Sequence, residues 1–302
     1  HTGSGGGITL SSDGTSLLLD GTAIGGGGGS PTLYAESLSG ATSPTATGTN
    51  SVAIGSDAQA TATNGSIAFG TATRASGNAN AAIGYQANAA GVGALATGYL
   101  ANAAADFSTA VGRNAKTATG SNATALTNSY ASGSNSFAAA IANNTSSYGA
   151  TGANSIAMGD RSSASGSRGI AIGGYGALAS GASSLAFGYQ ATANQSYASG
   201  FGYASKAYGQ YSWAGTQSHA SGLSSVALGI GDTTTTYGAQ HTSGVAIGYQ
   251  AVTTADKQIA LGSSTTPVKV SGAYTLPTAD GTANQVLTTD GSGAVTFATA
   301  GG

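Results

Sequence analysis

The chain has 302 residues, of which 51 are glycine and none is cysteine, and only 6% of its residues are charged, with a formal net charge of −2. Because ordinary domains contain about 7% glycine and about 25% charged residues, this composition argues against a helical globule, and the near-neutral charge argues against a nucleic-acid partner. No run of about 18 apolar residues is present, so no membrane insertion is predicted. The hydrophobic fraction of 40% with a low net charge argues against disorder of the whole chain.

The first part of the chain, residues 1–48, is a glycine-rich lead. Gly25 to Gly29 are five consecutive glycines, which predict a flexible joint. Leu17 to Leu19 form a short apolar patch, which we interpret as a strand.

Residues 49–262 are built from one repeated five-residue word. It reads small residue, apolar residue, alanine, apolar residue, glycine, as in Ser51–Gly55, Ser66–Gly70 and Ser155–Gly159. The closing glycines recur every 14 or 15 residues, and a looser Ala-Ser-Gly word falls half a period later. A period of this length fits two short strands and two tight turns. The pattern therefore predicts an all-β parallel solenoid of about fifteen rungs, stabilised by contacts between neighbouring rungs.

Side-chain alternation within the word predicts two faces for its strand. Val52 and Ile54 share one face, which we expect to fill the interior of the coil, and Ala53 lies on the other. The small alanine would then allow another copy of the chain to approach closely. The same reasoning predicts a structural core made of Val52, Ile54, Ile67, Phe69, Ile156, Met158, Ile170, Ile172, Leu185, Phe187, Val226, Leu228, Val245, Ile247, Ile259 and Leu261.

Two insertions interrupt the repeat. One of about five residues falls within 143–152, and another falls within 230–243. Insertions in a regular solenoid often carry recognition. Asp232 and Tyr237, in the second insertion, are therefore candidate receptor contacts.

The last part, residues 263–302, is predicted to be a small β segment. Asp280-Gly281 and Asp290-Gly291 are dipeptides that favour tight hairpin turns. Val286-Leu287 and Val295–Phe297 are the expected flanking strands.

Aromatic residues are concentrated in one stretch of the repeat. Tyr197, Tyr203, Tyr208, Tyr211 and Trp213 fall within 17 residues and are candidate receptor contacts, since aromatic rings serve carbohydrate and protein recognition. The alternative is that these rings cap the roll or pack between subunits. A Gly-Tyr-Gln-Ala word that occurs three times elsewhere indicates a structural role at a turn, or a multivalent surface along the roll.

Groups suited to catalysis are sparse and scattered. The ten carboxylates occur singly and are best explained as turn-capping or solvated groups, and no catalytic, metal-binding or phosphate-binding motif is present. We therefore predict no enzyme activity, no cofactor and no metal site. His219 and His241 leave two interpretations open, exposed turn residues or a metal site between subunits. A glycan-degrading enzyme would need paired carboxylates in a groove, and a purely mechanical filament is the remaining alternative.

The repeated words resemble the YadA-like head repeat of trimeric autotransporter adhesins and of some bacteriophage fibre proteins. That resemblance covers residues 50–262 and implies a left-handed parallel β-roll that assembles as a homotrimer. The segment 273–293 is similar to segments near the ends of phage tail fibres, and no basic neck or heptad stalk follows residue 262, unlike in the adhesins.

The resemblance implies a structural, adhesive, extracellular fibre protein, either a phage tail fibre or virion appendage that attaches to a host, or the head of a bacterial surface adhesin or matrix filament. The implied partners are two further copies of the chain, other fibre or virion proteins, and a glycan or protein receptor on the host surface.

Overall fold

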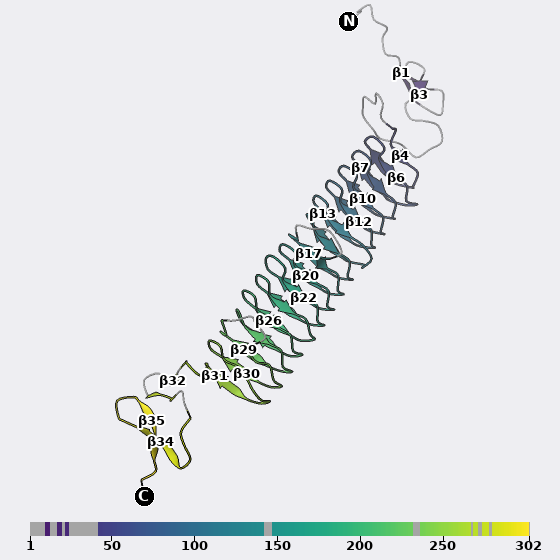
Figure 1. The fold of residues 1–302 in the computed structure, drawn as a ribbon. Coiled ribbons are helices and arrows are strands. Elements are labelled where there is room, and N and C mark those ends of the chain that lie inside the picture. The colour runs from purple at the N-terminus through teal and green to yellow at the C-terminus, as the bar shows by residue number, and fades with distance from the viewer. Residues whose placement is uncertain are drawn as a thin grey trace, which may run out of the picture. The chain divides into compact units, whose positions relative to one another are not determined.

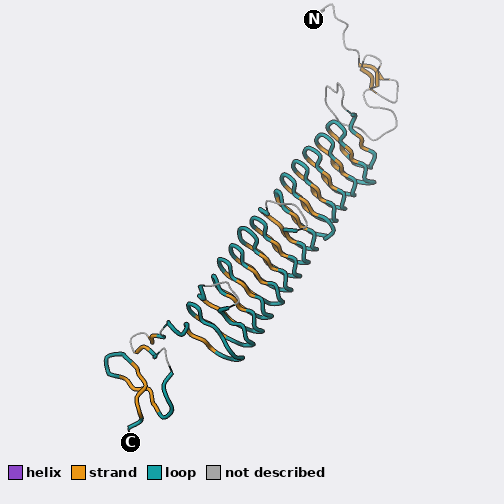
Figure 2. Tube along the Cα trace, viewed as in Figure 1, coloured by secondary structure: helices purple, strands orange, loops and turns teal. Residues whose placement is uncertain are grey.

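The computed structural model describes residues 10–12, 17–19, 22–23, 42–141, 147–231, 236–266, 268–270, 274–277 and 280–301. Two compact units make up the chain, His1–Ser136 and Phe137–Gly302, and each contains a stack of coils (Figure 1). The described residues form strands and turns without a helix (Figure 2). None of them therefore forms a helix long and apolar enough to cross a membrane.

In the first unit each coil contributes one strand of three residues and one of two residues to two separate walls. We call these the long-strand wall and the short-strand wall. The long strands are β5 (Val52–Ile54), β7 (Ile67–Phe69), β9 (Ala81–Ile83), β11 (Leu95–Thr97), β13 (Thr109–Val111) and β15 (Thr124–Leu126). The short strands are β4 (Thr45–Ala46), β6 (Gln59–Ala60), β8 (Arg74–Ala75), β10 (Asn88–Ala89), β12 (Asn102–Ala103), β14 (Lys116–Thr117) and β16 (Tyr130–Ala131).

The second unit repeats this construction. Its long strands, with one of two residues among them, are β17 (Phe137–Ala139), β19 (Ile156–Met158), β21 (Ile170–Ile172), β23 (Leu185–Phe187), β25 (Ser199–Phe201), β27 (Trp213–Ala214), β29 (Val226–Leu228), β30 (Val245–Ile247) and β31 (Ile259–Leu261). Its short strands are β18 (Gly149–Ala150), β20 (Ser163–Ala164), β22 (Leu178–Ala179), β24 (Thr192–Ala193), β26 (Lys206–Ala207) and β28 (His219–Ala220).

Neighbouring rungs pair in parallel and in register with the sequence repeat. Ala68 of β7 lies opposite Ala82 of β9, fourteen residues later, and Ala53 of β5 lies opposite Ala68, fifteen residues later. The fifteen strands of the long-strand walls described in the two units confirm the predicted solenoid and its rung number.

The register also confirms that both insertions extend single coils. Phe137 pairs with Ile156, and Val226 pairs with Val245, so each of these steps is nineteen residues instead of fourteen. The added residues 142–146 and 232–235 lie outside the described part of the chain, and Asp232 is among them.

The interior of the coils is lined by small residues, and the predicted core is wrong. Ala68, at the centre of β7, is fully buried, whereas its neighbours Ile67 and Phe69 are 44% and 51% exposed. Most long strands of both units follow this pattern, with the central alanine inward and the larger side chains outward, although Gly200 takes the central place in β25 and Ala260 in β31 is half-buried. The predicted core residues that are half-buried or exposed on the outer side are Val52, Ile54, Ile67, Phe69, Ile156, Met158, Ile170, Ile172, Leu185, Phe187, Val226, Leu228, Val245, Ile247, Ile259 and Leu261.

The physical reason for the small interior is the short distance between the two walls. The Thr117 hydroxyl, on short strand β14, donates to Oγ of Ser108, which precedes long strand β13, at 2.8 Å. At this rung a direct hydrogen bond between opposite walls leaves room only for small side chains such as alanine, serine, threonine and glycine. The two fully buried isoleucines, Ile141 and Ile230, lie beside the insertions. Close packing at this scale makes added atoms costly.

The turns between the walls extend the ladder of hydrogen bonds. Ala72, Gln86 and Leu100 follow successive long strands and have φ of +55°, +52° and +56°. This left-handed conformation costs a non-glycine residue about 1–2 kcal/mol. It directs each N–H to a carbonyl one rung earlier, for example Gln86 N to Thr71 O at 2.9 Å. Bonds between rungs therefore hold the turns in a conformation that their side chains disfavour.

Replacing Gly77 by alanine is expected to lower the free energy of unfolding by about 1–3 kcal/mol, the usual cost of overpacking. An added Cβ at Gly77 would lie 2.2 Å from the carbonyl oxygen of Gly91 on the next rung. Gly174→Ala is the control, since its nearest atom, Cδ2 of Tyr189, would be 4.0 Å away. Thermal melts followed by circular dichroism measure the difference, and equal melting temperatures for the two variants would contradict this packing.

Further short strands lie outside the coils. The predicted strand at Leu17–Leu19 is confirmed as β2, which pairs antiparallel with β1 (Leu10–Ser12) and β3 (Thr22–Ala23). The remaining strands are β32 (Lys269–Val270), β33 (Tyr274–Thr275), β34 (Gln285–Thr289) and β35 (Val295–Thr299).

The hairpin predicted at Asp290-Gly291 is confirmed, because β34 and β35 pair antiparallel around it. The backbone N–H groups of Ser292 and Ala294 donate to Oδ1 of Asp290 at 2.7 and 3.1 Å, and these bonds lower the pKa of its carboxyl below the ordinary value. The hairpin predicted at Asp280-Gly281 is wrong, since β33 pairs with β32 and not with β34.

Candidate functional site

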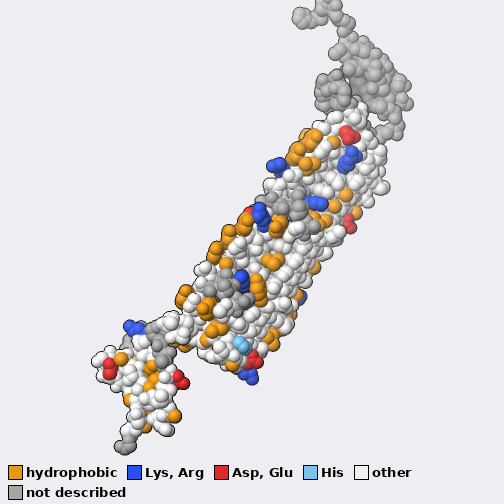
Figure 3. Space-filling view, viewed as in Figure 1, with side chains coloured by type: hydrophobic (Ala, Val, Ile, Leu, Met, Phe, Trp, Pro, Cys, Tyr) orange, Lys and Arg blue, Asp and Glu red, His pale blue; other side chains and the backbone are white. Residues whose placement is uncertain are grey.

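The long-strand wall of each unit carries rows of outward-facing apolar side chains. In the first unit Val52, Ile67 and Leu95 lie in one row on this wall and are 37–44% exposed, with Ala81 between the last two. In the second unit Phe187 and Ile259 are 50% and 68% exposed. Hydrophobic side chains recur along the coils, and Lys and Arg side chains lie beside some of them (Figure 3). An apolar face of this regularity is a candidate surface for contact with another chain.

Tyrosines form a stacked row at the turns that follow the long strands. Tyr175, Tyr189 and Tyr203 stack with ring centroids 5.7 and 5.5 Å apart. The guanidinium of Arg161 lies over the ring of Tyr175 at 4.7 Å, and a hydrogen bond to the Tyr175 side chain raises the pKa of Arg161 above its ordinary value. The row arises because residues fourteen apart occupy the same place on neighbouring rungs.

A second stacked pair lies at the other edge of the second unit. Tyr197 and Tyr211 stack at 4.9 Å with an angle of 6° between their planes. They precede long strands, whereas Tyr203 follows one, and the two kinds of turn join the walls at opposite edges of the coil. The structure therefore separates Tyr203 from Tyr197 and Tyr211.

The other candidate receptor contacts lie elsewhere in the second unit. Trp213 lies on the long-strand wall beside Phe201, with ring centroids 5.6 Å apart. Tyr208 meets His219 edge-on at 5.2 Å, and Tyr237 is half-buried. The aromatic cluster of the sequence is thus distributed over several places instead of one site.

His219 is not an exposed turn residue, and His241 is half-buried in a bend. His219 is 3% exposed in short strand β28, and Nδ1 of His241 lies 3.3 Å from Oγ1 of Thr253. Within the described part of the chain, no group of three His, Asp or Glu side chains is placed to hold a metal ion.

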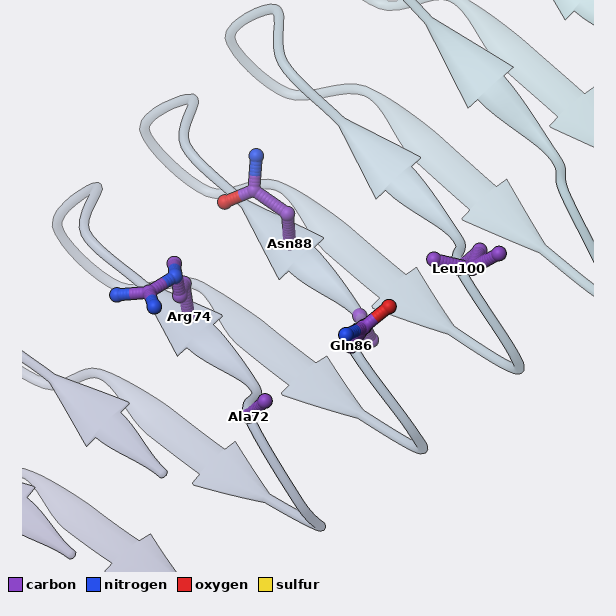
Figure 4. A pocket seen from close by; sticks show the side chains of 6 residues that line it. Ala72, Arg74, Gln86, Asn88 and Leu100 are labelled. Carbon is purple, nitrogen blue, oxygen red and sulfur yellow. The ribbon is translucent and has the colours of Figure 1, made fainter. Parts of the chain in front are cut away.

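A shallow hollow of about 310 Å³, which was not predicted from the sequence, lies on the first unit (Figure 4). Arg74 and Asn88, from neighbouring short strands β8 and β10, line one side. Ala72, Gln86 and Leu100 line the other side, and Ala87 completes the lining.

Arg74 is held at the hollow by the rung that precedes it. Its Nη1 donates to Oε1 of Gln59 at 2.5 Å, and its Nη2 lies 3.4 Å from Oδ2 of Asp57. Nε2 of Gln59 in turn donates to Oδ1 of Asp57 at 2.8 Å. Because the Arg74 side chain is 51% exposed, this ion pair contributes little to stability and serves to orient the guanidinium.

The coils are parallel, have an interior of small residues and carry regular rows of side chains on their outer surface. This architecture defines a solenoid module, a class of protein that binds partners along an extended surface. A family model for the YadA head domain repeat matches residues 46–71, 81–101, 89–115, 150–175, 179–199, 214–231 and 242–265. The repeat region of the chain therefore belongs to the YadA head family, whose members are surface-exposed, structural adhesin heads that form homotrimers. Comparison with curated proteins gave no significant match.

Proposed function

We propose that this chain forms a homotrimeric, non-enzymatic, extracellular fibre that attaches to the surface of a host. The observation that carries the proposal is the apolar row on the long-strand wall. Phe69 and Phe187, for example, are about half exposed in the single chain, and soluble monomers rarely expose long contiguous apolar surfaces. Two further copies of the chain are the occupants that the family membership supports.

In this assembly the long-strand walls of three chains face one another, and the short-strand walls and turns face solvent. The interior alanines give each chain a closed coil, and the outer apolar rows give the trimer its core. The left-handed winding and the threefold arrangement remain predictions from the resemblance.

Attachment would use side chains that recur on the outer surface. Equivalent groups on successive rungs and on three chains make many weak contacts act together, so that their avidity exceeds any single affinity. Stacked tyrosines supply rigid apolar faces with a polar tip. The proposed receptor contacts are Tyr197, Tyr203, Tyr208, Tyr211, Asp232 and Tyr237, as predicted from the sequence. Trp213, the remaining predicted contact, lies on the long-strand wall and would face another copy of the chain in this assembly.

Two kinds of protein that contain such a head fit these observations equally well. One is a phage tail fibre or other virion appendage, and the other is a bacterial trimeric adhesin or matrix filament. The family match ends at residue 265, so the similarity of 273–293 to phage fibres stays a prediction. Other fibre or virion proteins would be further partners in the first case.

Fluorescently labelled intact chain is expected to bind saturably to at least one member of a panel of bacterial and animal cells. Phe187→Glu, which places a charge in the apolar row of the long-strand wall, is expected to weaken that binding at least tenfold, because a separated chain loses avidity. Thr192→Glu, on the short-strand wall, is the matched control. Binding to no cell type, or equal binding by Phe187→Glu and the intact chain, would overturn the proposed function.

A further inference from the structure

The hollow on the first unit lies where a short side chain interrupts a series of longer ones. The turn that follows each long strand holds Asp57, Ala72, Gln86 and Leu100 on successive rungs. Ala72 is the one small residue of this series, and the hollow lies beside it (Figure 4). A volume of about 310 Å³ falls at the lower end of the range of small-molecule sites, roughly 300–1,000 Å³.

The groups around the hollow combine donors, acceptors and an apolar side chain. A guanidinium carries five N–H donors, and within the described part of the chain Arg74 directs two of them to Gln59 and Asp57. The Gln86 amide offers both a donor and an acceptor, as does that of Asn88, whose Nδ2 donates to Oδ1 of Asn102 at 3.3 Å.

The apolar side of the hollow is the side chain of Leu100, which is 40% exposed. Planar polar groups that both donate and accept match the vicinal hydroxyls of a sugar ring, and an exposed leucine side chain matches its C–H face. We propose that the hollow at Ala72, Arg74, Gln86, Asn88 and Leu100 binds one neutral hexose unit of a glycan.

The charge of the site favours a neutral sugar over an acidic one. Arg74 is paired with Asp57, whose carboxylate oxygen is 3.4 Å away. The carboxylate of an acidic sugar at the guanidinium would meet that of Asp57 at close range, and like charges at such distances repel. A hydroxyl has no such cost, since it can donate to the Asp57 network as well as accept from Arg74.

The hollow stays accessible in the proposed trimer. Arg74 and Asn88 lie on the short-strand wall, whereas the apolar rows lie on the long-strand wall. A trimer would therefore display three copies of the hollow toward solvent. This inference rests on the proposed function, because it names the class of surface molecule that the fibre would hold.

Saturation-transfer-difference NMR on the intact chain, with the methyl glycosides of glucose, galactose and mannose as probes, tests the inference. At least one probe is expected to receive saturation, and glucuronic acid is expected to receive none. Ala72→Gln fills the hollow with the residue that already stands at position 86, and Arg74→Ala removes the guanidinium. Each variant is expected to reduce the transfer at least fivefold. Ala204→Gln, at the equivalent turn of the second unit with φ of +50°, is the matched control.

The outcomes separate this inference from the proposed function. Transfer to none of the neutral probes, transfer to glucuronic acid alone, or undiminished transfer in Ala72→Gln and Arg74→Ala would overturn the hexose site. If those variants still form trimers and bind cells as the intact chain does, the proposed function stands without it. Melting curves of both variants that match the intact chain confirm that lost transfer reflects the hollow and not unfolding.

Discussion

Ala157→Leu is expected to lower the free energy of unfolding by about 3 kcal/mol or more, at the upper end of the cost of overpacking. Ala157 is fully buried at the centre of β19, and it pairs with Ala138 and Ala171 on the neighbouring rungs. Ala164, on the short-strand wall of the same coil, is also fully buried. The added carbons of leucine have no free space, and a displaced rung also disturbs its neighbours.

Denaturant unfolding followed by circular dichroism measures this loss, and Ala153→Leu provides the matched control. Ala153 is exposed in a turn of the same coil, so leucine there adds the same atoms outside the interior. Similar unfolding midpoints for Ala157→Leu and Ala153→Leu would show that the alanines do not line a closed interior.

Ile170→Glu is expected to convert the trimer into separate or unfolded chains. Ile170 lies on the outer side of β21, between Ile156 and Leu185 of neighbouring rungs, and in the proposed trimer it faces two other copies. Three unpaired carboxylates would then be buried together, and leaving one buried charge unpaired costs about 3–5 kcal/mol. Sedimentation velocity measures the distribution of assemblies.

The control for this change is Ser163→Glu, which places the same charge on the outer side of short strand β20. That variant is expected to sediment like the intact chain, because its side chain stays in solvent. If Ile170→Glu also sediments like the intact chain, the long-strand wall is not the contact between copies.

The repeat spacing was sufficient to predict the solenoid, because residues fourteen apart must occupy equivalent places on successive rungs. The choice of interior face was wrong, because alternation shows which side chains share a face but not which face is closed. The volume of the residue at each position would have indicated which face is closed. The central position of the long strand is alanine in Ala53, Ala68 and Ala157 alike, whereas its flanking positions range from alanine to phenylalanine. A closed interior limits the volume of the side chain at each position, whereas an outer surface accepts side chains of many sizes.

The repeat period also decides which of the candidate tyrosines lie together. Tyr197 and Tyr203 are close in sequence, yet six residues carry the chain across a coil to its other edge, whereas fourteen residues bring Tyr211 onto Tyr197. Aligning the turns shows alanine among longer side chains at Ala72, but it shows the same at Ala204, so the alignment alone does not locate the hollow. The side-chain contacts that orient Arg74 could not be predicted from the sequence, because they depend on the geometry of the preceding rung.

The solution mass of the intact chain, measured by light scattering, decides whether three copies assemble. We expect the mass of three 28.5 kDa chains, together with a β-type circular dichroism spectrum and a cooperative melt. The mass of one chain with the same spectrum and a cooperative melt would contradict this assembly, because the apolar rows would then face water in a stable protein.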